Sequence, residues 1–325
     1  MKALQHSFWT TIITIPIVSI LFSSCGPQPC TEGSCPDGQV CWTNGYCSLE
    51  VPAESGPGQA PLDPEAGCDL PQLICDPNTE DCAELIQFDP TYGYGYSDFP
   101  ENGETESNQY RSWLRRDNVY LIKYATARVA CLAEEWSYGN GGPLGLIDMS
   151  EEDGAIPGTS IGIPGHPEGT HTNGYDIDVA YYQKDSDDNS ARVICDYGAN
   201  HCTDFPYLMD EWRNALFLGS LYEHPGLRVV GADGKAGGML EQAFEMLCEW
   251  GWIKEDACLV EKFAYEFVNE GWGWYDFHHH HMHVSFNGTS GGYAAAASEM
   301  GDESLCITRD CDLEAVEEFY ATSGQ

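Results

Sequence analysis

Fifteen cysteines in a chain of 325 residues constrain the fold more than any other feature. An odd count in an exported protein indicates that one cysteine has another use, which leaves fourteen for up to seven disulfides. Because the chain has no C-x-x-C pair, disulfides in an oxidising compartment are favoured over zinc ligation by these cysteines. Spacing does not fix the connectivity, but three pairs are close enough to be local bridges: Cys195/Cys202, Cys248/Cys258 and Cys306/Cys311.

The N-terminus indicates export. Lys2 precedes an apolar stretch from Phe8 to Phe22, which is shorter than the roughly 20 residues of a membrane-spanning helix and is typical of a signal peptide. The stretch ends in Ser23-Ser24-Cys25-Gly26, which resembles a bacterial lipoprotein cleavage site. We therefore expect residues 1–24 to be a signal peptide and Cys25 to carry lipid, so that a membrane-anchored lipoprotein faces the periplasm or the cell exterior. The alternative is ordinary secretion after cleavage near Ser24.

The formal net charge of −38 arises from 52 acidic against 14 basic residues. It argues against a nucleic-acid partner, because such binding depends on Lys and Arg side chains that neutralise phosphates. It also argues against adhesion to an anionic membrane surface. The cluster Asp185-Ser186-Asp187-Asp188 lacks the Gly and the distal Glu of an EF-hand loop, so we interpret it as a solvated loop rather than a calcium site.

Composition divides the chain after the signal peptide into two parts. Residues 25–88 are rich in Cys, Pro, Gly and acids, and the stretch from Glu50 to Gly67 has no periodicity, which indicates a Cys-rich tether with a linker. Residues 89–325 have the composition of a globular domain with one core.

Within the globular part, helical and strand-like segments are interspersed. Apolar spacing predicts four helices, at Asn118–Trp136, Tyr207–Leu221, Met239–Trp250 and Val260–Val268. Strand-like runs occur at Leu144–Met149, Tyr175–Tyr182, Leu227–Val230 and His281–Phe286. This order predicts an α+β fold with a small, mainly antiparallel sheet and flanking helices.

Two segments concentrate histidine and aspartate and hold seven of the ten histidines. The first runs from His166 to Val179 and the second from Trp274 to Phe286. A single His-x-His in a strand is usually incidental, and a single Asp is usually a turn or capping residue. Together the two segments are much more specific for a metal site.

Strand geometry brings residues of both segments to one face. Alternation along the first strand places Asp176 and Asp178 on the same face, and His171 can fold back over it after the bend that Gly174 permits. On the second strand, His281 and His283 also share one face, roughly 7 Å apart. Two such strands side by side would provide three ligands and an open fourth position, as a catalytic zinc requires.

The pattern His-x-x-Gly-x-Asp-x-Asp from His171 to Asp178, followed about a hundred residues later by His281-Met282-His283-Val284, resembles the penicillin-insensitive murein endopeptidases. These are grouped with the lysostaphin, D-Ala-D-Ala peptidase and hedgehog-type zinc folds. The resemblance covers roughly Gly141–Tyr182 and Trp272–Phe286. The related carboxypeptidases place Glu three residues before the last ligand, where this chain has His280, which favours the endopeptidase-like branch.

The resemblance implies that Zn²⁺ is held by His171, Asp178 and His283 and that His281 assists catalysis. Asp176, His278 and His166 are expected as auxiliary residues, although His166 lies five residues before His171, where the family's additional histidine is closer.

The implied substrate is peptidoglycan, hydrolysed at its peptide cross-links. Two alternatives stay open: a hedgehog-like module that keeps zinc without catalysis, and a D-Ala-D-Ala carboxypeptidase. Ordinary protein substrates are a further possibility.

Overall fold

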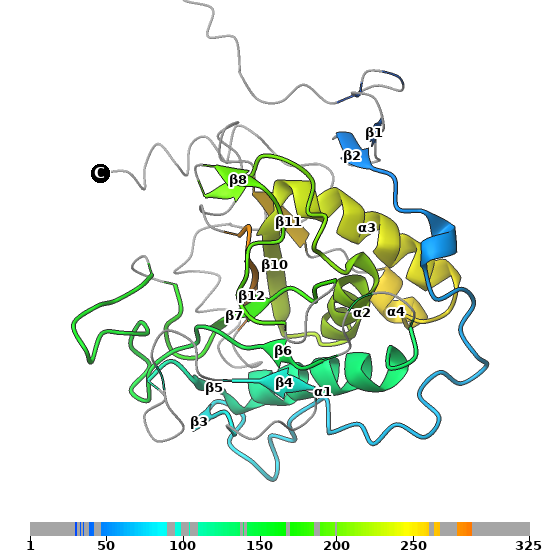
Figure 1. Ribbon diagram of the computed structural model, residues 1–325. Helices are drawn as coiled ribbons and strands as arrows, with labels where there is room; N and C mark the ends of the chain where they lie inside the picture. The colour runs from blue at the N-terminus through cyan, green and yellow to red at the C-terminus, as the bar shows by residue number, and fades with distance from the viewer. Residues whose placement is uncertain are drawn as a thin grey trace, which may run out of the picture.

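A four-stranded sheet carries both histidine- and aspartate-rich segments (Figure 1). Its strands occur in the order β11 (Phe263–Glu266), β10 (Leu227–Asp233), β12 (His281–Phe286) and β7 (Asp176–Ala180). Strand β12 is antiparallel to both of its neighbours, whereas β10 and β11 are parallel. The mixed α/β architecture with small, mainly antiparallel sheets confirms the predicted fold class at this level.

The computed structural model describes the following residues, with the side chains of 264–266 excepted: 30, 33, 35, 39–41, 47–89, 95–98, 104, 110–136, 139, 142–166, 170–184, 189–198, 200–259, 263–266 and 278–287. The signal peptide with Cys25, the Asp185–Asp188 cluster and the Cys306/Cys311 pair lie outside them.

Helices lie beside and below the sheet in Figure 1. They are α1 (Arg116–Leu132), α2 (Glu211–Tyr222), α3 (Gly234–Glu249) and the short α4 (Glu255–Cys258). The apolar positions that predicted α1 are all buried, as expected for an amphipathic helix: Val119, Ile122, Ala125, Val129 and Leu132. None of the described helices is long and apolar enough to cross a membrane.

Aspartate caps fix where two of these helices begin. The carboxylate of Asp210 accepts a hydrogen bond from the backbone N–H of Arg213, and Asp233 accepts one from Lys235. Asp233 also ends β10, so β10 leads directly into α3.

Short strand pairs surround the sheet. They are β1 (Gln39–Cys41) with β2 (Cys47–Leu49), β3 (Leu85–Gln87) with β5 (Trp113–Arg115), β4 (Tyr96–Ser97) with β6 (Leu144–Gly145), and β8 (Tyr197–Gly198) with β9 (His201–Cys202). A 3₁₀ turn, η1, spans Ala53–Ser55.

One predicted helix is wrong. Phe263–Glu266, inside the stretch predicted as the helix Val260–Val268, forms strand β11 at the edge of the sheet. Its backbone pairs with β10, from Val230 opposite Phe263 to Asp233 opposite Glu266. Pairing with a long neighbouring strand outweighs local helical spacing here, because the same apolar residues also suit a half-buried strand.

The stretch that the sequence suggests as a linker packs against the helices. The indole N–H of Trp212 donates to Ser55 Oγ at 3.2 Å, and that of Trp252 donates to the Gly58 carbonyl at 2.7 Å. The Cys68–Cys131 disulfide then ties this stretch to α1. Residues 51–68 therefore form a strap along α2 and α3.

Each of the twelve cysteines in the described part of the chain is in a disulfide. The suggested pairs Cys195/Cys202 and Cys248/Cys258 are among them. The other bridges join Cys30 to Cys41, Cys35 to Cys47, Cys68 to Cys131, and Cys75 to Cys82. Six disulfides indicate an oxidising, extracytoplasmic environment.

Candidate metal centre

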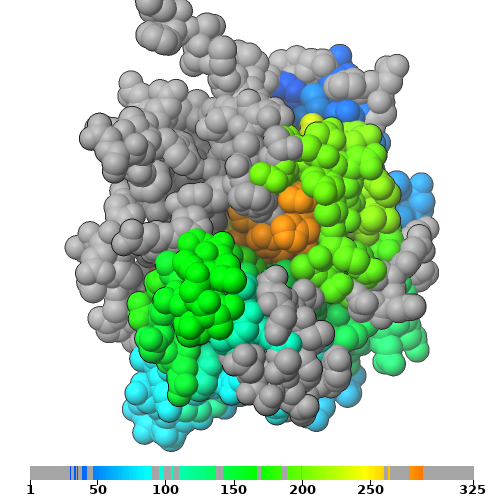
Figure 2. Space-filling model, turned by 60° about the vertical axis from the view of Figure 1, so that its left-hand side comes forward, coloured from blue at the N-terminus to red at the C-terminus, as the bar shows by residue number. Residues whose placement is uncertain are grey.

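The face of the sheet that carries the site is set by alternation along two paired strands. His283 of β12 lies directly opposite Asp178 of β7, and His281 lies opposite Ala180. The intervening residues Ile177, Val179, Met282 and Val284 are completely buried in the core. The opposite face therefore presents the two aspartates of β7 and the two histidines of β12. In Figure 2 the segment 278–287, coloured orange, lies at the bottom of a hollow between green segments.

His171 reaches this face from a tight bend before β7. Its φ of 52° is in the left-handed region, as are those of Asn173 and Gly174. A Cβ at Gly174 would come within 2.5 Å of the backbone nitrogen of Arg115, so the bend needs glycine there. Two hydrogen bonds hold the strained histidine: its backbone N–H donates to Asp176 Oδ2 at 3.1 Å, and its ring Nδ1 lies 3.1 Å from the carbonyl oxygen of Asp148.

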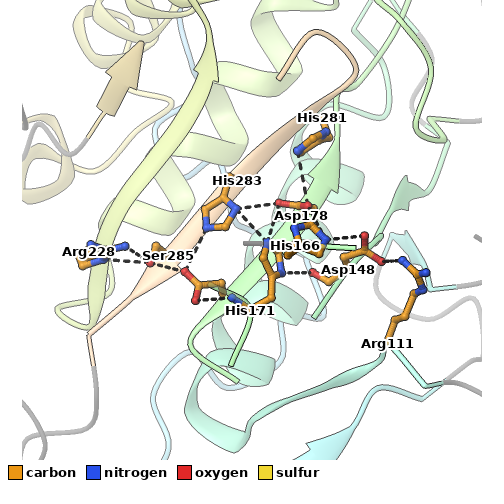
Figure 3. Close-up of polar contacts among 10 residues, drawn as sticks. Arg111, Asp148, His166, His171, Asp178, Arg228, His281, His283 and Ser285 are labelled. Carbon is orange, nitrogen blue, oxygen red and sulfur yellow. Dashed lines mark hydrogen bonds and ion pairs between the residues drawn. The ribbon is translucent and has the colours of Figure 1, made fainter. Parts of the chain in front are cut away.

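The contact with the Asp148 carbonyl also determines which ring nitrogen of His171 carries the hydrogen. A carbonyl oxygen only accepts, so Nδ1 of His171 carries the hydrogen and Nε2 has the free lone pair. Nε2 points to Asp178 and His283 (Figure 3).

Three donor atoms of the predicted ligands converge. His171 Nε2 lies 3.1 Å from His283 Nδ1 and 3.4 Å from Asp178 Oδ1, and His283 Nδ1 lies 2.9 Å from Asp178 Oδ1. Ligands of a tetrahedral zinc at its usual bond lengths are separated by about 3.4 Å. The three atoms therefore have the spacing of one face of such a site, and the residues fit the metal that the sequence predicts.

His166 adds a further nitrogen beside the same centre. His166, His171 and Asp178 each offer a ligand atom within 4.8 Å of the others, so this group can hold a metal ion. His166 Nε2 is 3.8 Å from Asp178 Oδ2 but only 2.8 Å from Asp148 Oδ2. His166 is therefore a candidate third ligand beside His171 and Asp178, as is His283, and its Nε2 also contacts Asp148.

A salt bridge between Arg111 and Asp148 holds the ring of His166 in place. Arg111 Nη1 donates to Asp148 Oδ1 at 2.6 Å, and the other oxygen of Asp148 binds His166. The ring of His166 lies at a centroid distance of 3.9 Å from that of His171, tilted by 32°. Arg111 and Asp148 thus hold His166 over the ligand cluster.

His281 lies on the open side of the cluster. Its Nε2 is 3.5 Å from Asp178 Oδ2, the oxygen that also faces His166. The side chains of His281 and His166 are 11% and 18% exposed, against 1% for His171 and 3% for Asp178. His281 and His166 are therefore the more exposed imidazoles beside the buried His171 and Asp178, and His283, at 9%, is nearly as exposed as His281.

His278 is a neighbour rather than a member of the cluster. Its ring centroid is 5.1 Å from that of His281 and 6.3 Å from that of His283. Its backbone carbonyl accepts a hydrogen bond from the Tyr181 hydroxyl at 3.0 Å, which anchors the turn before β12.

The charges of the cluster are strongly coupled. Burial lowers the pKa of His281 well below its usual value, despite the opposing charge of Asp178, so this ring is neutral at neutral pH. Burial would also lower the pKa of His283, but the hydrogen bonds that its ring donates to Asp176 and Asp178 raise the pKa to about 9. Burial would raise the pKa of Asp178, yet its interactions with the imidazoles of His281, His171 and His283 hold it well below its usual range. Without a metal, the cluster therefore holds a proton on His283, and a bound cation would displace it.

Models of known protein families give no match to this chain, and curated protein sequences give none either.

Alternation identified Asp176, Asp178, His281 and His283, and the bend at Gly174 identified His171. Sequence reasoning missed Asp148 and Arg111 as supports of the site, since nothing in their local sequence links them to the histidine- and aspartate-rich segments. It also missed Ser285, although Ser285 follows His283 at the same two-residue spacing on β12 and so could have been found.

Proposed function

We propose that this protein is a zinc-dependent peptidase that hydrolyses the peptide cross-links of peptidoglycan, as a murein endopeptidase does. The observation that carries the proposal is the convergence of His171 Nε2, Asp178 Oδ1 and His283 Nδ1 within 3.4 Å of one another. One carboxylate and two imidazoles are a ligand set that leaves a position open for catalysis.

Zinc, when bound, acidifies a water molecule and polarises a carbonyl group, which is the chemistry that amide hydrolysis needs. The protein's own groups complete the reaction. His281 is neutral, borders the opening and faces Asp178 Oδ2, so it is placed to accept a proton from the attacking water.

His166 stands on the other side of the same carboxylate oxygen. Burial would lower its pKa, but the hydrogen bond to Asp148 raises it, so the ring can carry a positive charge near neutral pH. A charged imidazole there is suited to stabilise negative charge on the substrate or to donate a proton to the leaving amine.

The substrate class is supported by compartment and resemblance. The six disulfides indicate an extracytoplasmic protein, and the two histidine- and aspartate-rich segments resemble the murein endopeptidases. Lipid on Cys25 would tether the enzyme to the membrane next to the cell wall. Peptidoglycan stem peptides are abundant there and bear the amide bonds in question.

Digestion of purified sacculi followed by mass analysis of the released fragments tests this function. We expect cross-linked muropeptide dimers to decrease and monomers with intact stem peptides to increase. Loss of a terminal D-alanine alone would instead support the carboxypeptidase. Unchanged sacculi together with cleavage of casein would indicate a general secreted protease.

A further inference from the structure

A hydrogen-bonded chain of side chains lies behind His283, on the side away from Asp178. His283 Nε2 lies 3.1 Å from Asp176 Oδ1, and the Ser285 hydroxyl lies 2.6 Å from the same oxygen. The guanidinium of Arg228 contacts Ser285 Oγ twice, from Nε at 3.0 Å and from Nη2 at 2.7 Å. These hydrogen-bonded side chains come from three adjacent strands, β10, β12 and β7. Figure 3 shows Arg228 and Ser285 next to His283.

The chemistry of these side chains determines which group donates and which accepts in each hydrogen bond. A guanidinium has only donors, so both contacts from Arg228 end on the lone pairs of Ser285 Oγ. The single hydroxyl hydrogen of Ser285 is then directed to Asp176, at the short distance of a charge-assisted hydrogen bond. Asp176 is an ionised acceptor, so Nε2 of His283 must be the nitrogen that carries the hydrogen. The lone pair of Nδ1 is left for the ligand cluster.

The backbone is adapted to place Arg228 here. Along the β10–β12 ladder, Leu227 pairs with Phe286 and Val229 pairs with Ser285, so β10 uses two residues where β12 uses one. Arg228 is the extra residue of this β-bulge, directly beside Ser285. Bulges re-aim a side chain and are over-represented next to active sites. The bulge directs Arg228 to Ser285.

Asp176 receives donors from two parts of the cluster. Its Oδ1 takes His283 and Ser285, while its Oδ2 takes the backbone N–H of the strained His171. Asp176 is only 6% exposed, and its pKa lies below its usual range because His283 outweighs the opposing effect of burial. One buried carboxylate thus orients both histidine ligands.

We infer that Ser285 and Arg228 are positioning residues for the metal: through Asp176 they fix the ring of His283 so that Nδ1 is its donor atom. The inference rests on the proposed zinc site and concerns residues that the sequence motif does not include. Carboxylate partners of metal-bound histidines typically contribute 10–100-fold to metal affinity. Here the carboxylate itself is held by a hydroxyl and a guanidinium.

Zinc affinity of purified protein, measured by competition with a chromophoric chelator, tests the inference. We expect Ser285→Ala to weaken zinc binding by about 10-fold or more and Ser285→Thr, which keeps the hydroxyl, to restore it to within about threefold of wild type. Arg228→Met keeps the aliphatic stem but removes both donors, and we expect a smaller loss in the same direction. Visible absorption of the cobalt-loaded protein should change in Ser285→Ala and recover in Ser285→Thr.

Ser220 provides a matched control. It is a buried serine on α2 that also accepts a hydrogen bond from an arginine, Arg128 Nη1, at 3.0 Å. Ser220→Ala should leave zinc affinity unchanged. An unfolding transition of the metal-free variants shows whether Ser285→Ala folds. If it does not fold, the zinc affinity of Arg228→Met tests the inference in its place.

Wild-type zinc affinity in both Ser285→Ala and Arg228→Met would overturn this inference and leave the zinc site standing. A wild-type protein that binds no zinc would overturn both. The same 10-fold loss in Ser220→Ala as in Ser285→Ala would also overturn it, because it would show a general packing effect.

Discussion

His283 Nδ1 lies 2.9 Å from Asp178 Oδ1, across the antiparallel ladder in which the two residues are direct partners. Backbone hydrogen bonds between the two strands of such a ladder hold facing residues side by side. Two of the three proposed ligands are therefore part of the sheet, and only His171 depends on a strained bend. A site on rigid strands keeps its donor atoms in place before the metal arrives.

Alanine at His171, Asp178 or His283 should each abolish stoichiometric zinc binding. Each change removes one of three atoms that lie within 3.4 Å of one another and leaves too few protein ligands. Metal analysis of the dialysed proteins gives the result. His224→Ala is the control, since the ring of His224 instead accepts a hydrogen bond from the Gly226 backbone. Full zinc content in all three site variants would contradict the ligand assignment.

His281→Ala should separate chemistry from binding. We expect it to keep about one zinc per chain but to lose about 10²–10⁴-fold in kcat, the usual contribution of a general acid or base. A hedgehog-like binding module predicts no such dependence on His281. Unchanged cleavage by His281→Ala at wild-type zinc content would remove this residue from the mechanism.

Strand alternation explains why much of the site could be predicted. A repeat of two residues places Asp176 with Asp178, and His281 with His283, without knowledge of the rest of the fold. The same repeat reaches Ser285. Arg228 could not be found this way, because it stands in a bulge where the alternation of β10 is interrupted.

Long-range contacts set the limits of prediction elsewhere. Arg111 and Asp148 are 37 positions apart and meet because their two segments are paired by backbone hydrogen bonds, among them Met149 N–H to the Arg111 carbonyl. Phe263–Glu266 forms a strand because β10 offers it an edge, which its own spacing does not reveal. Likewise, the indole groups of Trp212 and Trp252 bind Ser55 and Gly58 in a stretch whose composition resembles a free linker.

Zinc affinity should rise with pH. Asp176 and Asp178 overcome the effect of burial and raise the pKa of His283 to about 9, so zinc must displace a proton below that pH. If one proton is displaced, affinity increases about tenfold per pH unit up to about pH 9 and then levels off. Chelator competition between pH 6 and pH 8 measures the slope. A flat profile would contradict the proton on His283.

The raised pKa of His283 also makes the stability of the metal-free protein depend on pH. The pKa of His283 is above its ordinary value of 6.5, so its charged form stabilises the fold fully below about pH 6.5. That stabilisation is lost as pH rises through about 9. The metal-free protein should therefore melt at a lower temperature at pH 9 than at pH 6.5, by more than the His283→Gln variant does. An equal shift in both proteins would argue against this assignment.

Two buried carboxyl groups near the site make a separate contribution to the pH dependence of stability. Burial raises the pKa of Asp98 to about 7 and that of Glu104 to about 8. Since the folded protein holds these protons more tightly than the unfolded chain, its stability falls as pH rises from about 4 to about 8. Urea unfolding of Asp98→Asn should show a gain over wild type that grows between pH 5 and pH 8. A gain independent of pH would mean that Asp98 is ionised in the fold.

The Cys68–Cys131 disulfide should stabilise the fold more than the Cys248–Cys258 disulfide. The first closes a loop with a sequence separation of 63 and the second one of 10. Chain entropy alone gives about 4 kcal/mol for the first and about 3 kcal/mol for the second. Denaturant unfolding of the paired Cys→Ala variants measures both. A larger loss for the Cys248/Cys258 pair would show that the strap of residues 51–68 is held by its other contacts.

Cleavage of purified sacculi, titrated with zinc after complete chelation, tests the central claim most directly. We expect no release of muropeptides from the metal-free protein, a linear rise with added zinc, and a break at one equivalent per chain. His171→Ala should release none at any ratio. Release that persists without metal, or the absence of release at one bound zinc per chain, would contradict the proposal that this centre cleaves peptidoglycan.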